Sequence, residues 1–113
     1  MTTLINCTPH AINLVLEDGF NIAIESSGMV ARAIQTNRKV GQVELEDSTI
    51  PLVKAEYGEV YDLPAPQEGV LYIVSGLTAA AAPERKDLVG TTDLVRDEAG
   101  RIIGCRALCV YNQ

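Results

Sequence analysis

The chain has 113 residues and a net charge of -6; 47% of its residues are hydrophobic and 21% are charged. This length suits one domain, and this composition is that of a folded globular protein rather than a disordered one. We therefore expect a single globular domain over residues 1–113. Because the chain has no Trp and only one Phe, its core must be mainly aliphatic.

The acidic charge is spread over the whole chain, with eight acids and four bases in residues 1–60 and seven acids and five bases in residues 61–113. Such a surface repels phosphate backbones, so we expect no nucleic acid among the partners. No apolar stretch approaches the roughly 20 residues that span a bilayer, so we expect no membrane contact. Three cysteines without the spacing of a disulfide framework, and a start without an export signal, favour a cytoplasmic location.

Strands are predicted for most of the first 35 residues. Apolar and polar side chains alternate over residues 12–16 and again over residues 20–24, with a Gly-containing turn between them, which is typical of a hairpin. Leu4-Ile5 and Thr8-Pro9 precede this hairpin, and we expect a further strand from Met29 to Gln35. The period of two places Arg32 on an apolar face of that strand, where it would need a partner.

The middle of the chain is less regular. Residues 36–48 are predicted to be a polar excursion with an acidic cluster, and a short edge strand is the alternative there. Residues 49–55 should form a strand that tolerates Pro51 because it lies at a sheet edge. Tyr57-Gly58-Glu59 should then turn the chain before it continues to a loop at residues 64–69.

The last third contains the most hydrophobic run, residues 70–74, which we expect to be a buried strand. A short helix over residues 77–82 should follow, with Ser75 as its N-terminal cap. Extended segments within residues 88–95 and 101–110 should be joined as a hairpin. These elements predict a mostly β (α+β) fold: a small barrel or rolled mixed sheet of about seven short strands with one short helix.

Two interpretations of the segment Asn6-Cys7-Thr8-Pro9-His10 compete. In one, the Cys7 thiol is a nucleophile and His10, the only histidine, is its base. In the other, Asn6, Thr8 and His10 satisfy backbone groups around a proline turn while Cys7 packs inward. Because no third orienting group and no catalytic signature accompany the pair, we assign no catalytic residue and favour a protein that is not an enzyme. An enzyme that uses Cys7 and His10 remains the alternative.

A metal site would need Cys7, His10, Cys105 and Cys109 to converge. Cys105 and Cys109 lie in a predicted strand, where residues four apart are separated by about 13 Å. One zinc ion holds its sulfur ligands at about 2.3 Å and could not reach both unless the strand bends or bulges. We therefore assign no metal ligands and no cofactor.

Positive charge offers a different kind of site. The planar guanidinium group suits carboxylates and phosphates, so three arginines could converge on a small anionic ligand. An acid lies within two residues of Arg85 and of Arg96, so ion pairs that fix turns are the default interpretation of these side chains. Ser75 precedes a helix start, where free backbone donors favour anions, although a cap is its more usual role. The candidate ligand-binding residues are Arg32, Ser75, Arg85, Arg96 and His10.

Three segments occur in a familiar order: Asn6-Cys7-Thr8-Pro9-His10, then Ser26-Ser27-Gly28 with Arg32, then Pro83-Glu84-Arg85-Lys86-Asp87-Leu88-Val89. This order resembles that of small uncharacterised proteins of bacteria and their phages, which often open with an Asn-Leu-Thr-Pro-His segment. The resemblance covers nearly the whole chain and implies a phage or prophage setting, with no known activity. Cys7 stands where those proteins carry leucine, which argues against a catalytic or metal-binding role for it.

These features predict a small non-enzymatic accessory protein of phage or prophage type. Its expected partner is a protein or a small anionic, nucleotide-like ligand. A structural oligomerisation module is a further alternative; it would expose an edge strand at residues 49–55 and form a homo-oligomer.

Overall fold

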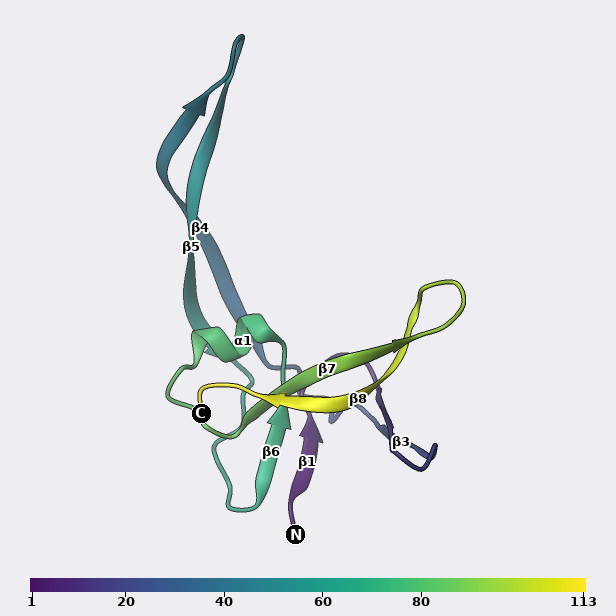
Figure 1. Ribbon diagram of the computed structural model, residues 1–113. Helices are drawn as coiled ribbons and strands as arrows, with labels where there is room; N and C mark the ends of the chain where they lie inside the picture. The colour runs from purple at the N-terminus through teal and green to yellow at the C-terminus, as the bar shows by residue number, and fades with distance from the viewer.

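Eight strands and one short helix make up the fold in the computed structural model, which describes residues 1–113 (Figure 1). In chain order they are β1 Thr3–Asn6, β2 Ile12–Val15, β3 Asn21–Ile24, β4 Arg32–Glu44, β5 Thr49–Tyr61, β6 Val70–Ile73, α1 Gly76–Ala81, β7 Leu88–Arg96 and β8 Ile102–Val110. The predicted fold class, mostly β with a mixed sheet and one short helix, is confirmed. The helix has six residues, and no helix is long and apolar enough to cross a membrane.

Six strands form one mixed sheet in the order β1-β6-β7-β8-β2-β3. β1, β6 and β7 are parallel, β8 is antiparallel to β7, and β2 is parallel to β8 and antiparallel to β3. A parallel bridge between Asn6 and Ser26 brings the two edges together, so the sheet is nearly closed into a barrel. We refer to these six strands and α1 as the body.

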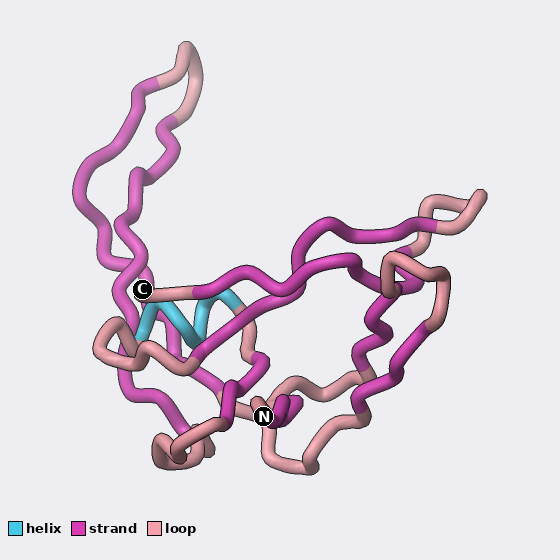
Figure 2. Tube along the Cα trace, turned by 60° about the horizontal axis from the view of Figure 1, so that its bottom comes forward, coloured by secondary structure: helices cyan, strands magenta, loops and turns pink.

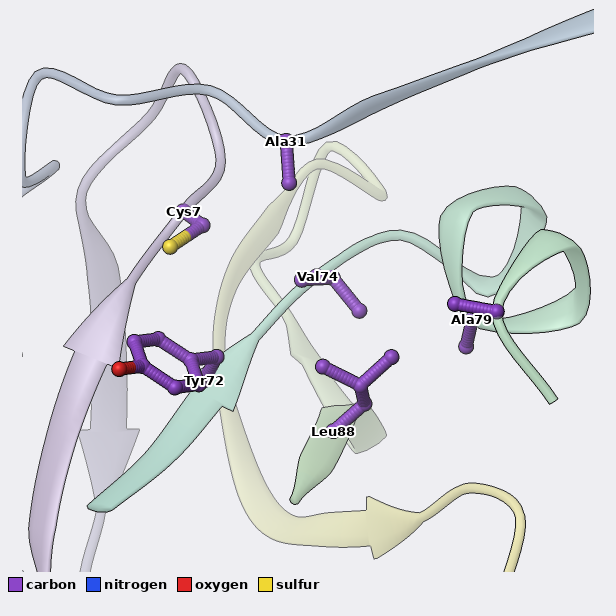
Figure 3. Packing of buried hydrophobic residues seen from close by; sticks show 7 residues of the cluster. Cys7, Ala31, Tyr72, Val74, Ala79 and Leu88 are labelled. Atoms are coloured by element: carbon purple, nitrogen blue, oxygen red, sulfur yellow. The ribbon is translucent and has the colours of Figure 1, made fainter. Parts of the chain in front are cut away.

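The core of the body is small (Figure 3). Only 13 of the 113 residues are buried, and all of them lie outside β4 and β5. The largest are Tyr72 and Ile73 on β6 and Leu88 and Val89 on β7. Because β6 lies between β1 and β7 in the sheet, its last two residues, Tyr72 and Ile73, are buried. This agrees with the buried strand predicted from the apolar run at residues 70–74.

Side chains cap both ends of α1. Ser75 Oγ accepts a hydrogen bond from the backbone N–H of Thr78 at 3.2 Å, which confirms the predicted N-terminal cap. At the other end, Asn112 Nδ2 donates to three carbonyl oxygens at 3.0 to 3.2 Å, those of Ala79, Ala82 and Arg85. Asn112 therefore satisfies carbonyl groups that a helix end leaves without partners, a role that the sequence did not reveal.

β4 and β5 form a separate two-stranded antiparallel sheet that projects from the body (Figures 1 and 2). We refer to this hairpin as the arm. Each of its strands has 13 residues, and none of them is buried. The arm makes the molecule extended: the radius of gyration is 17.7 Å, whereas a compact domain of this length has a radius of about 13 Å.

The arm corrects the prediction for the middle of the chain. Residues 36–44, predicted as a polar excursion, continue β4, and the strand predicted from Met29 begins at Arg32. Tyr57-Gly58-Glu59, predicted as a turn, lie inside β5, where a register shift opposite Ala33–Gln35 absorbs one extra residue as a bulge. Acids separate and follow the apolar residues before the turn of this ribbon, so their alternation resembled a polar loop and the strand pattern there was weak.

Candidate functional site

Asn6 is the centre of the turn that follows β1. Its side chain is buried, and its Nδ2 donates to the carbonyl oxygens of His10 at 2.7 Å and Ile24 at 2.9 Å. Its Oδ1 accepts hydrogen bonds from the backbone N–H and the hydroxyl of Thr8, at 2.9 and 2.6 Å. All four hydrogen-bonding positions of the carboxamide are therefore used. This confirms the structural interpretation for Asn6 and Thr8, whereas His10 contributes its backbone carbonyl rather than its ring.

Cys7 packs inward, as the structural interpretation of the turn predicted. Its side chain is 1% exposed and belongs to the core cluster with Tyr72 and Leu88 (Figure 3). Burial raises the pKa of the Cys7 thiol above its ordinary value, so the thiol is protonated and weakly nucleophilic at neutral pH. His10 is exposed, and its ring makes no hydrogen bond to the thiol.

The other two cysteines lie on β8, and Cys105 lines one cavity together with Thr8 and His10 of this turn. Cys105 is buried on β8, and Cys109 lies four residues further along the same strand. Burial raises the pKa of the Cys105 thiol as well. No three His, Cys, Asp or Glu side chains in the structure form a group that could hold a metal ion.

Arg85 is held by groups of its own chain. It forms a bidentate ion pair with Asp87, at 2.9 and 2.8 Å, and donates to the carbonyl oxygen of Pro64 at 2.8 Å. Its guanidinium carbon lies 5.8 Å from the centre of the Tyr72 ring, within the range of a cation–π contact. The hydrogen bonds from Arg85 lower the pKa of Asp87. Arg85 thus ties the loop before β6 to the start of β7.

Arg96 and Arg32 lie elsewhere and are exposed. Arg96 donates to the carbonyl oxygen of Gly100 at 2.8 Å and so belongs to the turn between β7 and β8. The acid of that turn, Asp97, pairs at 3.0 Å with Arg101 and not with Arg96. Arg32, the first residue of β4, makes no ion pair. The three candidate guanidinium groups therefore do not share one pocket.

His10 and Ser75 do line one cavity, of about 450 Å³. Apolar side chains of β2 and β8 form much of its wall, and the other polar residues that line it are Thr8, Asn13 and Thr91. No lysine or arginine lines this cavity, so its walls suit an uncharged ligand better than an anion. Ser75 also lines a second hollow, of about 310 Å³, together with Arg32.

The register of the arm assigns its side chains to two faces. Directly opposite residues of an antiparallel pair lie on the same face, and side chains alternate along each strand. Val43 lies opposite Ile50, and Gly41 lies opposite Leu52, so these residues share one face near the tip. Leu45, two residues beyond Val43 at the start of the turn, continues that face.

We refer to Val43, Leu45, Ile50 and Leu52 as the apolar arm face. Their side chains are between 41% and 55% exposed, and no other element covers them (Figure 1). The opposite face at the same level carries Gln42, Glu44, Thr49 and Pro51. The tip of the arm is therefore amphipathic, although water surrounds both of its sides. A contiguous exposed apolar surface of this kind is typical of a contact with another molecule.

Sequence reasoning missed the apolar arm face. The signal in the sequence was an apolar residue at every second position on each side of a short turn: Val43 and Leu45 before it, and Ile50 and Leu52 after it. Acids between these residues made the segment look like a polar loop. Treating residues 40–53 as one hairpin would have placed all four side chains together.

Comparisons with known proteins found no relative for the chain. No protein-family model matches it, and neither the curated proteins nor the solved structures contain a significant match.

Proposed function

We propose that this protein is a non-enzymatic binding protein whose arm binds a protein partner. The apolar arm face carries the proposal, because its four aliphatic side chains are about half exposed on a hairpin that adds no buried residue to the core. A protein surface can cover such a projecting face, whereas a small ligand needs a concave site. The resemblance to small proteins of bacteria and phages supports an accessory role in a phage or prophage.

The free energy available on the arm is substantial. Fully burying one Val, Leu or Ile side chain contributes about 1.5 to 3 kcal/mol, so covering the exposed halves of four such side chains offers roughly 3 to 6 kcal/mol. Association itself costs several kcal/mol, so further contacts are needed. The two outer edges of the arm have unpaired backbone groups that can supply them, because the arm sheet has only two strands.

Affinity capture with matched variants tests the proposal. Leu52→Lys places a charge on the apolar arm face, and Thr49→Lys places the same charge on the opposite face close by. We expect tagged wild-type protein and Thr49→Lys to retain the same protein from an extract of the natural cells, and Leu52→Lys to lose it. Equal retention by all three proteins would show that the apolar arm face is not the binding surface.

The cavity beside His10 and Ser75 supports a second candidate function, the binding of a small ligand. Its volume of about 450 Å³ lies in the range of small-molecule sites. Because it lacks basic residues, we propose a largely uncharged ligand in place of the nucleotide-like anion. Thermal-shift screening with both classes tests this, and Thr91→Trp, which fills the cavity, should remove any shift. A shift that only nucleotides produce, and that survives Thr91→Trp, would exclude this site.

An enzyme that uses Cys7 and His10 has less support, because the thiol is buried and its pKa is raised. Reaction with a thiol reagent at neutral pH distinguishes the two possibilities. Cys109, which is half-buried, should be labelled faster than Cys7. Faster labelling of Cys7 would favour the enzyme.

A further inference from the structure

Charge is ordered along the arm around its apolar face. Three acids lie toward the tip: Glu44, Glu46 and Asp47. Three bases lie on the side of the body: Arg38, Lys39 and Lys54. Glu56, just beyond them toward the body, forms an ion pair with Arg38 at 2.6 Å. The segment from residue 38 to residue 54 therefore has no net charge, and the whole charge of -6 belongs to the rest of the chain. From the tip to residues 38 and 54, the order along the arm is acidic, apolar, basic.

The isolated chain also exposes more surface than a compact protein of its mass. A compact monomer of 12.1 kDa exposes about 6,000 Å², whereas this chain exposes 7788 Å². The difference of about 1,800 Å² exceeds the roughly 800 Å² that each partner buries in a stable complex of standard size. Strands of 13 residues extend about 40 Å, so the arm is long enough to provide much of this area.

A second copy of this chain complements the charge order of the arm. If two arms lie antiparallel with their apolar faces in contact, the tip acids Glu46 and Asp47 of each arm lie near Arg38 and Lys54 of the other, and symmetry makes this contact twice. Arg38 and Lys54 share the apolar face by register, whereas Glu44 and Lys39 lie on the opposite face. A parallel arrangement would instead place acid beside acid and base beside base. Outside the arm both copies are acidic and repel each other, so the arm is where they can approach closely.

We propose that two copies of this chain associate through their arms in an antiparallel, two-fold symmetric dimer, with the apolar arm faces in contact. This inference rests on the proposed function, in which the arm binds a protein, and it identifies that protein as a second copy. The apolar contact supplies affinity, and the two acid–base contacts determine the antiparallel direction.

Sedimentation equilibrium of the full chain measures the association directly. We expect a mass of twice 12.1 kDa for the wild type at roughly 0.1 mM. Leu52→Lys should weaken association by roughly tenfold or more, because it places an ammonium group against apolar side chains. Thr49→Lys adds the same charge to the opposite face and should keep the association constant within about threefold. Circular dichroism of both variants shows whether they keep the strand content of the wild type.

Charge reversal tests the antiparallel direction. One chain carries Arg38→Glu and Lys54→Glu, which reverse the two bases on the apolar face, so its arm is acidic at the tip and largely acidic toward the body. The other carries Glu46→Lys and Asp47→Lys, so its arm is largely basic in both places. Each variant alone should associate at least about tenfold more weakly than the wild type. An equimolar mixture should form the heterodimer, and rising salt should weaken it.

Three results would overturn this inference. The first is a wild-type chain that stays monomeric at roughly 0.1 mM; it would leave the proposed function intact, because another protein could still cover the arm. The second is equal weakening by Leu52→Lys and Thr49→Lys, and the third is a mixture of charge variants that stays monomeric. The proposed function itself fails only in the capture experiment, if Leu52→Lys retains every partner of the wild type.

Discussion

The body and the arm use the same aliphatic residue types in opposite environments. Leu88 and Val89 in the body are 0% and 2% exposed, whereas Leu52 and Val43 in the arm are 48% and 41% exposed. The body is a nearly closed sheet with α1, so its strands have an interior to face, and the arm is a single two-stranded layer without one. Hydrophobic alternation thus predicts which apolar side chains share one face of a strand, but it does not predict whether another element covers that face.

This contrast predicts that the same substitution is costly in the body and nearly neutral in the arm. These differences in the free energy of unfolding between body and arm variants should be measured at low protein concentration, where the arms of two copies do not cover each other. Association would add a term that depends on protein concentration.

The largest effect is expected for Asn6→Ala. It removes a carboxamide that makes four hydrogen bonds in a buried turn, so it should lower the free energy of unfolding by about 4 kcal/mol. Asn37→Ala in the arm is the matched control: Asn37 is exposed and accepts one long hydrogen bond, so the change should be within about 0.5 kcal/mol. Urea denaturation measures both, and similar losses would break the contrast.

Gly90→Ala should have the next largest effect. A Cβ atom at Gly90 would lie 2.6 Å from Cζ of Tyr111, so the ring must move, and we expect a loss of about 3 kcal/mol. Gly41→Ala in the arm places its Cβ 4.0 Å from Leu52, an ordinary contact, and should be nearly neutral. Adding Tyr111→Ala should make the loss from Gly90→Ala much smaller. Additive losses in that double variant would disprove the clash.

Asp87→Asn and Glu56→Gln together compare a partly buried ion pair in the body with an exposed one in the arm. The side chains of Arg85 and Asp87 are 13% and 16% exposed, and loss of the carboxylate should cost about 2 kcal/mol at pH 7. Glu56→Gln removes the ion pair with Arg38 in the arm, whose side chains are 48% and 62% exposed, and should cost less than about 0.5 kcal/mol. Thermal unfolding at neutral pH measures both differences.

The pH dependence of Asp87→Asn tests the cause. The hydrogen bonds from Arg85 lower the pKa of Asp87 in the folded chain below its ordinary value of 3.8. The stabilisation is therefore fully present above pH 3.8 and is lost as the pH falls through the lower, folded-state pKa. The difference between wild type and Asp87→Asn should shrink only in that acidic range. A difference that already falls between pH 7 and pH 5 would point to another group.

Shortening the arm should have the smallest effect on the fold itself. Joining Thr36 to Glu56 through Asn-Gly removes the distal arm at a point where the two residues lie opposite each other, and Asn-Gly suits a tight hairpin turn. We expect the free energy of unfolding at dilution to change by less than about 1 kcal/mol. The melting temperature of the full chain should rise with protein concentration, whereas that of the shortened chain should not. A shortened chain that fails to fold would mean that the body depends on the distal arm.

Local signals in the sequence predicted much of the body. Turn chemistry and alternation located the hairpin of β2 and β3, the run at residues 70–74 located β6, and Ser75 located the start of α1. The pairing of strands could not be read in this way. β2 is parallel to β8 through Leu14 and Cys105, a contact between distant segments that no local pattern encodes.

The candidate site was predicted less well, for a physical reason. Arg85 and Arg96 were candidate anion-binding residues, and ion pairs with nearby acids were the competing interpretation. That interpretation is right for Arg85 with Asp87, whereas Arg96 donates to the carbonyl oxygen of Gly100 and Asp97 pairs with Arg101. The apolar arm face was missed because acids lie between and beside its apolar residues, so the segment resembled a polar loop. The length of β4 and β5 depends on a ladder of backbone pairs, and side-chain patterns report that ladder poorly when neither face is buried.

The parallel contact between β2 and β8 also affects synthesis of the chain. About 90 residues separate Leu14 from Cys105, and ribosomes add roughly 5 to 20 residues per second. The strand that joins β2 and β3 to the rest of the sheet is therefore synthesised on the order of 5 to 20 s after them. During that interval the nascent arm and the early hairpin are both uncovered. Molecular chaperones therefore have a defined period in which to act on this protein before its sheet can close.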